Sequence, residues 1–204
     1  MAIILVRHGE TALNAARVMQ PADTPLSERG RAQADAVGRR LQSHRCSGIV
    51  SSDLPRAWQT ATAIAAHSGL SPTPSALLHE RNFGALRGQP YDTLGFEPLT
   101  MAGAPPFGES AREFSDRVAQ AFDAMLQWHQ AASGDLVVVT HGLLIRVLLT
   151  DWLQLDAESL AGLHLGNTSV SMFDAAAPYR LQLLNCTRHL DSATAAQPRG
   201  LSGG

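Results

Sequence analysis

Two apolar runs that each end in a His-Gly pair constrain this chain most. Ala2–Val6 and Leu136–Thr140 are short and rich in branched residues, which predicts strands buried on both faces. The first run continues into Arg7-His8-Gly9, and the second continues into His141-Gly142 and an apolar helix over Leu143–Leu153. In a sheet of parallel strands, ligands bind at the carboxyl ends of the strands. We therefore expect both histidines at one ligand-binding edge.

Helical and strand patterns alternate in the first half of the chain. Ser27 precedes a helical pattern that reaches about His44, and Gly48–Ser51 is typical of a second short strand. Asp53 is the expected N-cap of the next helix, with Pro55 in its first turn. This alternation predicts an α/β fold with three layers, in which a mostly parallel central sheet has helices on both faces.

The second half begins with an irregular segment from about Ser71 to Gly108, which is rich in proline and glycine. Such a long segment inside a compact domain is more often functional than idle. Ser110 and Glu113 form a capping-box pattern for a helix that ends before Gly134. Two final strands are expected near Thr168–Phe173 and Tyr179–Asn185.

The length of 204 residues, 45% of them hydrophobic, suits one core of ordinary size. We therefore expect a single domain over residues 1–190. Residues 191–204 have no core pattern and are predicted to be a disordered tail.

All 16 basic residues are arginine, and the chain contains no lysine. Schiff-base enzymes, pyridoxal-phosphate enzymes, P-loop nucleotide sites and protein kinases each need a particular lysine, so these classes are excluded. The net charge of -2 offers no broad basic surface for nucleic acid, and no apolar run is long enough for a membrane span. Cys46 and Cys186 form no CxxC pair and suggest small core residues in a cytoplasmic protein.

The strand ends bring together groups that suit phosphate. Arg56 follows the second strand and lies in the first turn of a helix, where free backbone N–H groups favour an anion. Together with Arg7 and the two histidines it could surround one oxyanion, because the arginine fork matches phosphate oxygens. A neutral histidine can attack phosphorus, and Glu80 is the best-placed acid for the leaving group. Beside a phosphate dianion the pKa of Glu80 should rise.

Several ordered motifs carry a resemblance to a known family. They are Leu5-Val-Arg-His-Gly-Glu-Thr11 with Asn14, Pro25-Leu-Ser-Glu-Arg-Gly30, Ser51-Ser-Asp-Leu-Pro-Arg-Ala57, Glu80 with Phe83-Gly84, Gly108-Glu-Ser110, and Val139-Thr-His-Gly142. In this order they resemble the histidine phosphatase superfamily, which includes cofactor-dependent phosphoglycerate mutases. The resemblance spans about residues 3–185 and implies a phosphoglycerate mutase-like fold.

The resemblance also implies roles for particular residues. His8 would be the nucleophile that becomes phosphorylated, and Glu80 would be the acid for the departing alcohol and then the base for water. The phosphoryl group would be held by Arg7, Asn14, Gln20, Arg56, His141 and the backbone of Gly142. No metal and no cofactor are implied. Leu13, Pro21 and Arg87 stand where many relatives have tryptophan, glycine and glutamate, which leaves the substrate open.

We expect hydrolysis of a small-molecule monophosphate. The stretch between Glu80 and His141 is short, and the tail offers no pattern for a lid that would keep water from a mutase intermediate. Three alternatives stay open: a phosphoglycerate mutase-type transfer, a phosphate-binding protein without turnover, and a metallohydrolase with His8, His141 and Glu80 as ligands.

The segment from Asn82 to Glu109 is expected to cover the leaving group. Its apolar residues favour a neutral or partly apolar alcohol, and they are Phe83, Leu86, Tyr91, Leu94, Phe96, Leu99, Met101 and Phe107. Arg81 and Arg87 are the nearest candidates for binding a second negative group. The expected partner is therefore a small phosphomonoester, and a homodimer is left open.

Overall fold

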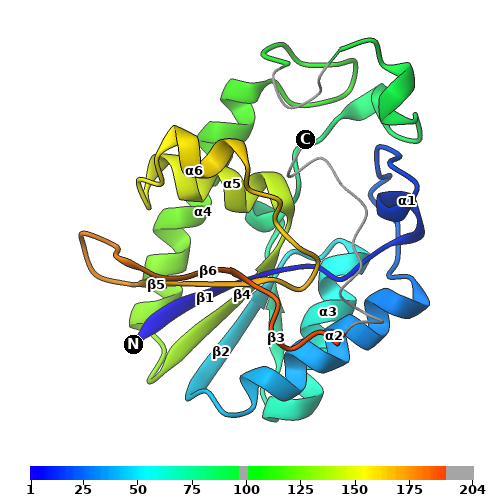
Figure 1. Cartoon of the computed structure of the whole chain (residues 1–204). Coiled ribbons are helices and arrows are strands. Elements are labelled where there is room, and N and C mark those ends of the chain that lie inside the picture. Colours follow the sequence, from blue (N-terminus) through cyan, green and yellow to red (C-terminus); the bar gives the residue numbers. More distant parts are fainter. Residues whose placement is uncertain (97–100, 192–204) are drawn as a thin grey trace.

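A six-stranded sheet forms the centre of the protein in a computed structural model that describes residues 1–96 and 101–191 (Figure 1). The strands lie in the order β3-β2-β4-β1-β5-β6. Their bounds are β1 Ala2–Arg7, β2 Cys46–Ser51, β3 Pro72–Pro74, β4 Asp135–Thr140, β5 Val170–Asp174 and β6 Leu181–Cys186. Neighbours among β3, β2, β4 and β1 pair in parallel, whereas β5 and β6 are antiparallel additions. The predicted mostly parallel sheet is confirmed.

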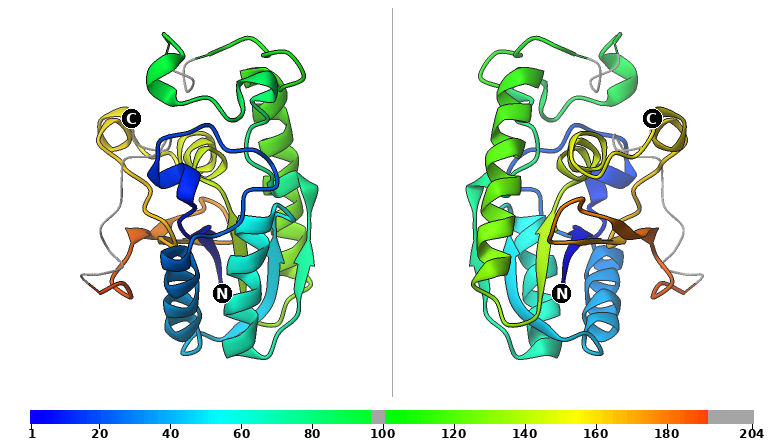
Figure 2. Two further views of the ribbon diagram at one scale, coloured as in Figure 1. Left: turned by 90° about the vertical axis from the view of Figure 1, so that its right-hand side faces the viewer. Right: turned by 90° about the vertical axis from the view of Figure 1, so that its left-hand side faces the viewer.

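Helices cover both faces of this sheet, as predicted (Figure 2). The α-helices are α1 Ala12–Ala15, α2 Glu28–Leu41, α3 Pro55–Ser68, α4 Ala111–Gln130, α5 Gly142–Asp151 and α6 Ala157–Ala161. Three short 3-10 helices are η1 Ala76–Leu78, η2 Gly84–Leu86 and η3 Tyr91–Thr93. The helices α2 and α3 pack on one face, and α4 and α5 pack on the other.

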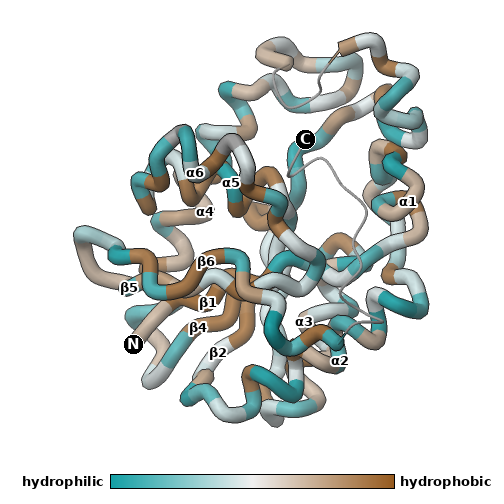
Figure 3. Tube along the Cα trace, viewed as in Figure 1, coloured by the Kyte–Doolittle hydropathy of each residue, from teal (hydrophilic) through white to brown (hydrophobic). Residues whose placement is uncertain are grey.

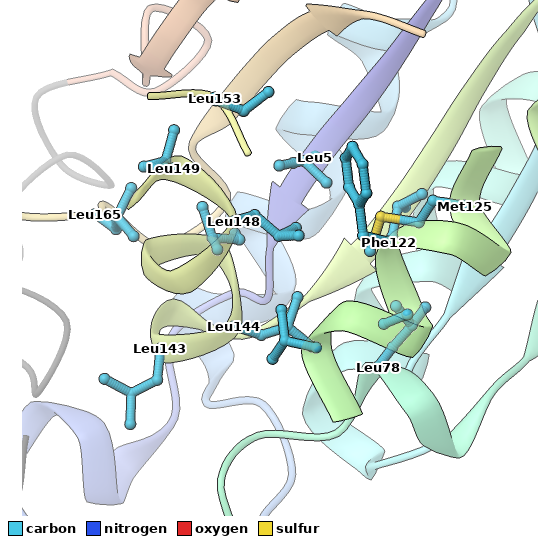
Figure 4. Packing of buried hydrophobic residues seen from close by; sticks show 14 of the residues in the cluster. Leu5, Leu78, Phe122, Met125, Leu143, Leu144, Leu148, Leu149, Leu153 and Leu165 are labelled. Carbon is cyan, nitrogen blue, oxygen red and sulfur yellow. The ribbon is translucent and has the colours of Figure 1, made fainter. Parts of the chain in front are cut away.

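The central strands are apolar throughout because each face meets a different helix layer. Ile4 and Val6 of β1 join the core beneath α2 and α3. Ile3 and Leu5 point to the other side, where they join Phe122 of α4 and the leucines of α5 (Figure 4). The apolar colour along β1 and β4 in Figure 3 reflects this two-sided burial. Burial on both faces is why the two runs lack the polar alternation of a half-exposed strand.

The register of β1 and β4 sets the positions of the two histidines. Arg7 pairs with Thr140 at the carboxyl end of both strands, so His8 and His141 follow side by side. The backbone N–H of His8 donates to the Thr140 carbonyl at 2.9 Å. The segment after β3 extends beyond this end of the sheet (Figure 2). The two His-Gly pairs therefore meet at one edge, as the strand pattern predicts.

Local details differ from the sequence predictions at two places. The N-cap of α3 is Leu54 and not Asp53, whose carboxylate instead forms a hydrogen bond with the His79 ring. Pro55 does lie in the first turn, as expected. The irregular segment contains the unpredicted strand β3, whose prolines are tolerated because it lies at the edge of the sheet.

Other expectations concern the termini and the thiols. Cys46 and Cys186 are free and half-buried. Cys46 packs against the core beneath α2 and α3, as expected of a small core residue, whereas Cys186 belongs to neither core cluster of the described residues. Within the described residues, no helix combines the length and the apolar character that a membrane crossing requires. Residues 192–204, which make up nearly all of the predicted tail, lie outside the described part of the chain.

Candidate active site

His8 and His141 form the centre of the site. Their ring centroids lie 5.1 Å apart, and the two residues are 2% and 0% exposed. Burial lowers the pKa of both imidazoles well below 6.5, and the nearby Arg56 cation lowers the pKa values further. Both rings are therefore neutral near pH 7.

Hydrogen bonds orient both rings. His8 Nδ1 lies 2.7 Å from the Gly9 carbonyl oxygen, which can only accept, so Nδ1 carries the proton. This leaves the lone pair on Nε2 of His8. His141 Nε2 lies 2.8 Å from Ser52 Oγ, whereas its buried Nδ1 has no hydrogen-bond partner in the described part of the chain. Sequence reasoning assigned no role to Ser52, although it lies within one of the family motifs.

Two arginines approach this centre from different elements. Arg7 ends β1 and donates to the Leu165 carbonyl, and Arg56 lies in the first turn of α3. Nη1 of Arg56 donates to the carbonyls of Pro21 and Ala22 at 3.3 and 3.4 Å. Burial lowers the pKa of each guanidinium to about 10, so both remain charged at neutral pH. Two fixed cations therefore lie beside the neutral histidines.

Glu80 is held by backbone donors. Its Oε1 accepts from the N–H of Arg81 at 3.0 Å, and its Oε2 accepts from the N–H of Leu143, in the first turn of α5, at 3.1 Å. Burial raises the pKa of Glu80 above 4.5, although these hydrogen bonds and the arginines oppose the rise. The direction is the expected one, but its cause here is burial. A carboxyl with a raised pKa is suited to proton transfer near neutral pH.

The predicted site residues gather around one pocket. It is lined by Arg7, His8, Asn14, Met19, Gln20, Arg56, Glu80, Arg81, Phe83, Arg87, Tyr91 and Gly142. His141 is not at the pocket surface and instead lies against the ring of His8. Met19 and Tyr91 complete the wall. Tyr91 was expected in the covering segment, whereas no role was assigned to Met19 from the sequence. A bound group there would meet several cations and one carboxyl.

Asn14 and Gln20 are linked through a short network. Thr11 is the N-cap of α1, where its hydroxyl accepts from the N–H of Asn14 at 2.9 Å and donates to Gln20 Oε1 at 2.7 Å. The side-chain oxygen of Asn14 is buried and has no hydrogen-bond partner in the residues that the structure describes. Both side chains line the pocket, and the N-cap of α1 is Thr11 and not Asn14.

Arg81 and Arg87 differ in what their side chains contact. The Arg81 guanidinium donates to the carbonyls of Met101, Gly103 and Glu109 at 2.8 to 3.2 Å, so it fixes the covering segment. Arg87 forms no side-chain hydrogen bond or ion pair within residues 1–96 and 101–191 and lies close enough to lower the pKa of Arg56. Of the two candidates, Arg87 is the one with a guanidinium free to meet a ligand.

The covering segment contributes less apolar surface to the pocket than expected. Phe83 and Tyr91 line it. Phe96 and Phe107 are 45% and 93% exposed, and Leu99 lies outside the described residues. The other three pack against the core: Leu86, Leu94 and Met101.

The metallohydrolase alternative requires clustered ligands. Across residues 1–96 and 101–191, no three side chains of the His, Cys, Asp or Glu type come together in a way that could hold a metal ion. His8, His141 and Glu80 thus share the site without forming a ligand set.

Comparisons with known proteins agree with this arrangement. The family model of the histidine phosphatase superfamily (branch 1) matches residues 3–187. The probable phosphoglycerate mutase GpmB of Yersinia pestis is 36% identical over an alignment of 205 positions, which covers 93% of this chain and 94% of the relative.

Solved structures are similar as well. A mycobacterial glucosyl-3-phosphoglycerate phosphatase has a TM-score of 0.78 at 29% identity, covering 91% of this chain and 99% of its own. A phosphoserine phosphatase mutant from Entamoeba histolytica, in complex with phosphoserine, has a TM-score of 0.77 at 25% identity, covering 93% and 98%. The family match and the strand-end histidines agree, and the chain belongs to the histidine phosphatase superfamily.

Proposed function

We propose that this protein hydrolyses small phosphomonoesters through a phosphohistidine at His8. The observation that carries the proposal is the orientation of His8, whose Nε2 lone pair is free because Nδ1 donates to the Gly9 carbonyl. The lowered pKa keeps this nitrogen unprotonated at neutral pH. The cations of Arg7 and Arg56 line the same pocket and would bind the phosphoryl oxygens.

In the first step, Nε2 of His8 attacks phosphorus and the bond from phosphorus to the ester oxygen breaks. Glu80, in its protonated form, gives its proton to the departing alkoxide, which leaves as an alcohol. Burial supports this role because it raises the pKa of Glu80 and so increases the protonated fraction. The positive charges of Arg7 and Arg56 stabilise the negative charge on the equatorial oxygens.

In the second step, Glu80 is ionised and takes a proton from water. The water oxygen attacks phosphorus, the bond from phosphorus to His8 Nε2 breaks, and inorganic phosphate is released. His8 returns to its neutral form and Glu80 returns to its acid form, so protons and charges balance over the cycle. Asn14, Gln20 and the Gly142 N–H, which belong to residues that line the pocket, are proposed to hold the phosphoryl group through both steps. His141, whose ring lies against that of His8, is proposed to contact the phosphoryl group once it is bonded to His8, through the Nδ1 that has no hydrogen-bond partner in the described residues.

Transfer to a second alcohol is the alternative to hydrolysis. The 36% identity with a probable phosphoglycerate mutase supports it, whereas the phosphatases among the solved relatives support hydrolysis. We favour hydrolysis because only a short stretch separates Glu80 from His141, which limits the cover that could keep water from the intermediate.

The proposed substrate is a small alcohol phosphate that carries a further negative group. Arg87 supports this choice because its guanidinium has no ion pair within the described residues, and the pocket offers little of the apolar lining expected from the sequence. Phosphoserine and glucosyl-3-phosphoglycerate, which are named for two solved relatives, are phosphate esters that carry a carboxylate. A substrate of this class would place its carboxylate near Arg87.

A panel of phosphomonoesters, read by release of inorganic phosphate, tests the proposal. The wild-type protein should turn over members of the panel and yield acid-labile phosphohistidine after rapid quenching, and His8→Asn should do neither. Full activity in His8→Asn would contradict the proposal. A parallel assay with 3-phosphoglycerate separates hydrolysis from isomerisation to 2-phosphoglycerate.

Two further parts of the proposal need their own measurements. Independence of metal predicts unchanged turnover after treatment with a chelator. A cytoplasmic location stays a prediction, which fractionation of the source cells would test.

A further inference from the structure

Four successive backbone carbonyls around Glu80 each receive a hydrogen bond. Arg117 of α4 donates to the carbonyls of Leu77 and His79 at 3.0 and 2.9 Å, and to that of Glu80 at 3.3 Å. The hydroxyl of Thr140 donates to the remaining one, Leu78, at 2.8 Å. Thr140 directly precedes His141, so the backbone that carries Glu80 is fixed both to α4 and to the strand that carries a site histidine.

Glu109 completes this arrangement. Its carboxylate binds the Arg117 guanidinium in a bidentate pair, with distances of 2.8 and 2.9 Å. The same carboxylate accepts from the backbone N–H of Asn82 at 2.8 Å, and the N–H of Glu109 donates to the Asn82 carbonyl at 2.7 Å. Glu109 and Arg117 therefore hold the chain on both sides of Glu80.

Arginine suits this position for a geometric reason. Its planar fork has five N–H donors, so one side chain can pair with a carboxylate and still donate to three carbonyls. A lysine has a single nitrogen and cannot span these acceptors. The segment before Glu80 ends in a 3-10 turn and not in a long helix or strand, so little regular backbone pairing fixes it.

We propose that Arg117, paired with Glu109, is a positioning residue for Glu80 in proton transfer to the leaving group. The inference rests on the proposed hydrolysis and extends it to a residue that does not line the pocket. Proton transfer requires the Glu80 carboxyl to lie within hydrogen-bond distance of the ester oxygen. Displacement of the Glu80 backbone would increase this distance.

The test compares two leaving groups. p-Nitrophenolate departs without a proton, whereas the alkoxide of β-glycerophosphate requires one, so only the second substrate depends strongly on the acid. In Arg117→Lys, kcat/KM for β-glycerophosphate should fall at least about tenfold, which is a part of the about 100- to 10,000-fold that general acids contribute. For p-nitrophenyl phosphate it should fall no more than about threefold. A general loss of structure would lower both values equally.

A double-mutant cycle sharpens the test. If Arg117 acts through Glu80, Arg117→Lys should have little further effect on β-glycerophosphate in a Glu80→Gln background. Arg112→Lys is the matched control, because Arg112 lies on the same helix in an exposed pair with Asp116. It should leave both substrates unchanged. Glu109→Gln provides a second variant should Arg117→Lys fail to fold, and it should show the same substrate split.

The outcomes separate the two proposals. Turnover that is absent in the wild type, or unaffected in His8→Asn, would remove the proposed hydrolysis and this inference with it. Turnover that depends on His8, combined with an equal loss on both substrates or an additive cycle, would overturn the positioning role alone.

Discussion

The carboxylate of Glu80 accepts a hydrogen bond from the backbone N–H of Leu143, 3.1 Å away. Leu143 lies two residues after His141, in the first turn of α5. The proposed acid is therefore attached to the same strand-to-helix turn that carries a site histidine. Its ionisation and that of the two histidines are expected to shape the pH dependence of the reaction.

We expect a bell-shaped profile of kcat/KM for an alkyl phosphate. His8 must be unprotonated to attack, and its pKa is lowered, so activity persists well below pH 6.5 as the pH falls. Glu80 must be protonated, and its pKa is raised, so activity is lost as the pH rises through that value. The substrate phosphate also titrates near a pKa of about 6. A competitive inhibitor with a sulfonate in place of the phosphate does not titrate there, so the pH dependence of its inhibition constant separates the ionisation of the enzyme from that of the substrate.

Glu80→Gln provides the control for this profile. It should lower kcat/KM and remove the decline on the alkaline side, because the amide does not titrate. A wild-type profile that rises steadily to pH 9 would contradict the assignment of Glu80 as the acid.

The meeting of the two His-Gly pairs at one edge of the sheet was predictable, because it follows from short-range sequence patterns. An apolar run before Arg7 and another before His141 predict buried parallel strands, and parallel strands place their carboxyl ends together. The order of the motifs then identifies the family. The register between β1 and β4, which brings the two rings to 5.1 Å, needed the structure.

The parts that sequence reasoning missed depend on contacts between distant segments. Asp53 is a good N-cap by residue type, but in the folded protein its carboxylate forms a hydrogen bond with His79, which is distant in sequence, and does not cap α3. Ser52 and Arg117 act through partners 89 and up to 40 positions away. No local pattern encodes such pairs. The apolar residues of the covering segment could not be assigned to pocket, core or surface without coordinates.

Arg87 and Arg81 should respond differently to substitution. Arg87→Gln is expected to lower kcat/KM at least about tenfold for a substrate with a carboxylate, because a charge-assisted hydrogen bond is worth about 1.5–3 kcal/mol. The same variant should change kcat/KM for a neutral alcohol phosphate little. Phosphoserine and the phosphate ester of ethanol form a suitable pair of substrates.

Arg81→Gln should instead lower stability, because the Met101, Gly103 and Glu109 carbonyls lose their donor. Its substrate preference should stay that of the wild type. An equal effect of Arg87→Gln on both substrates would count against the proposed carboxylate contact.

Ser52→Ala should destabilise the protein and reduce turnover. The substitution removes the partner of His141 Nε2 in a fully buried position, and an unsatisfied buried polar group costs about 1–3 kcal/mol. Urea denaturation measures the change in the free energy of unfolding. Ser47→Ala is the control, since the Ser47 hydroxyl has no hydrogen-bond partner in the described residues. Equal stabilities of the two variants would show that the His141 contact contributes nothing.

Gly30→Ala tests how closely α2 must approach the loop after His8. A Cβ at Gly30 would lie 2.0 Å from the backbone oxygen of Glu10, and that oxygen also accepts from the N–H of Ser27 at 2.9 Å. Because the clash is with backbone, no side chain can move to relieve it. We expect a loss of about 3 kcal/mol or more in the free energy of unfolding.

The displaced loop also carries Gly9, whose carbonyl orients the His8 ring, so residual folded Gly30→Ala should have reduced turnover. Gly162→Ala is the matched control. A Cβ at Gly162, just after α6, would meet no atom within 4 Å, so its free energy of unfolding should change by less than about 1 kcal/mol. If Gly30→Ala proved as stable and active as Gly162→Ala, the loop after His8 could shift without cost, and close contact with α2 would not be what positions the nucleophile.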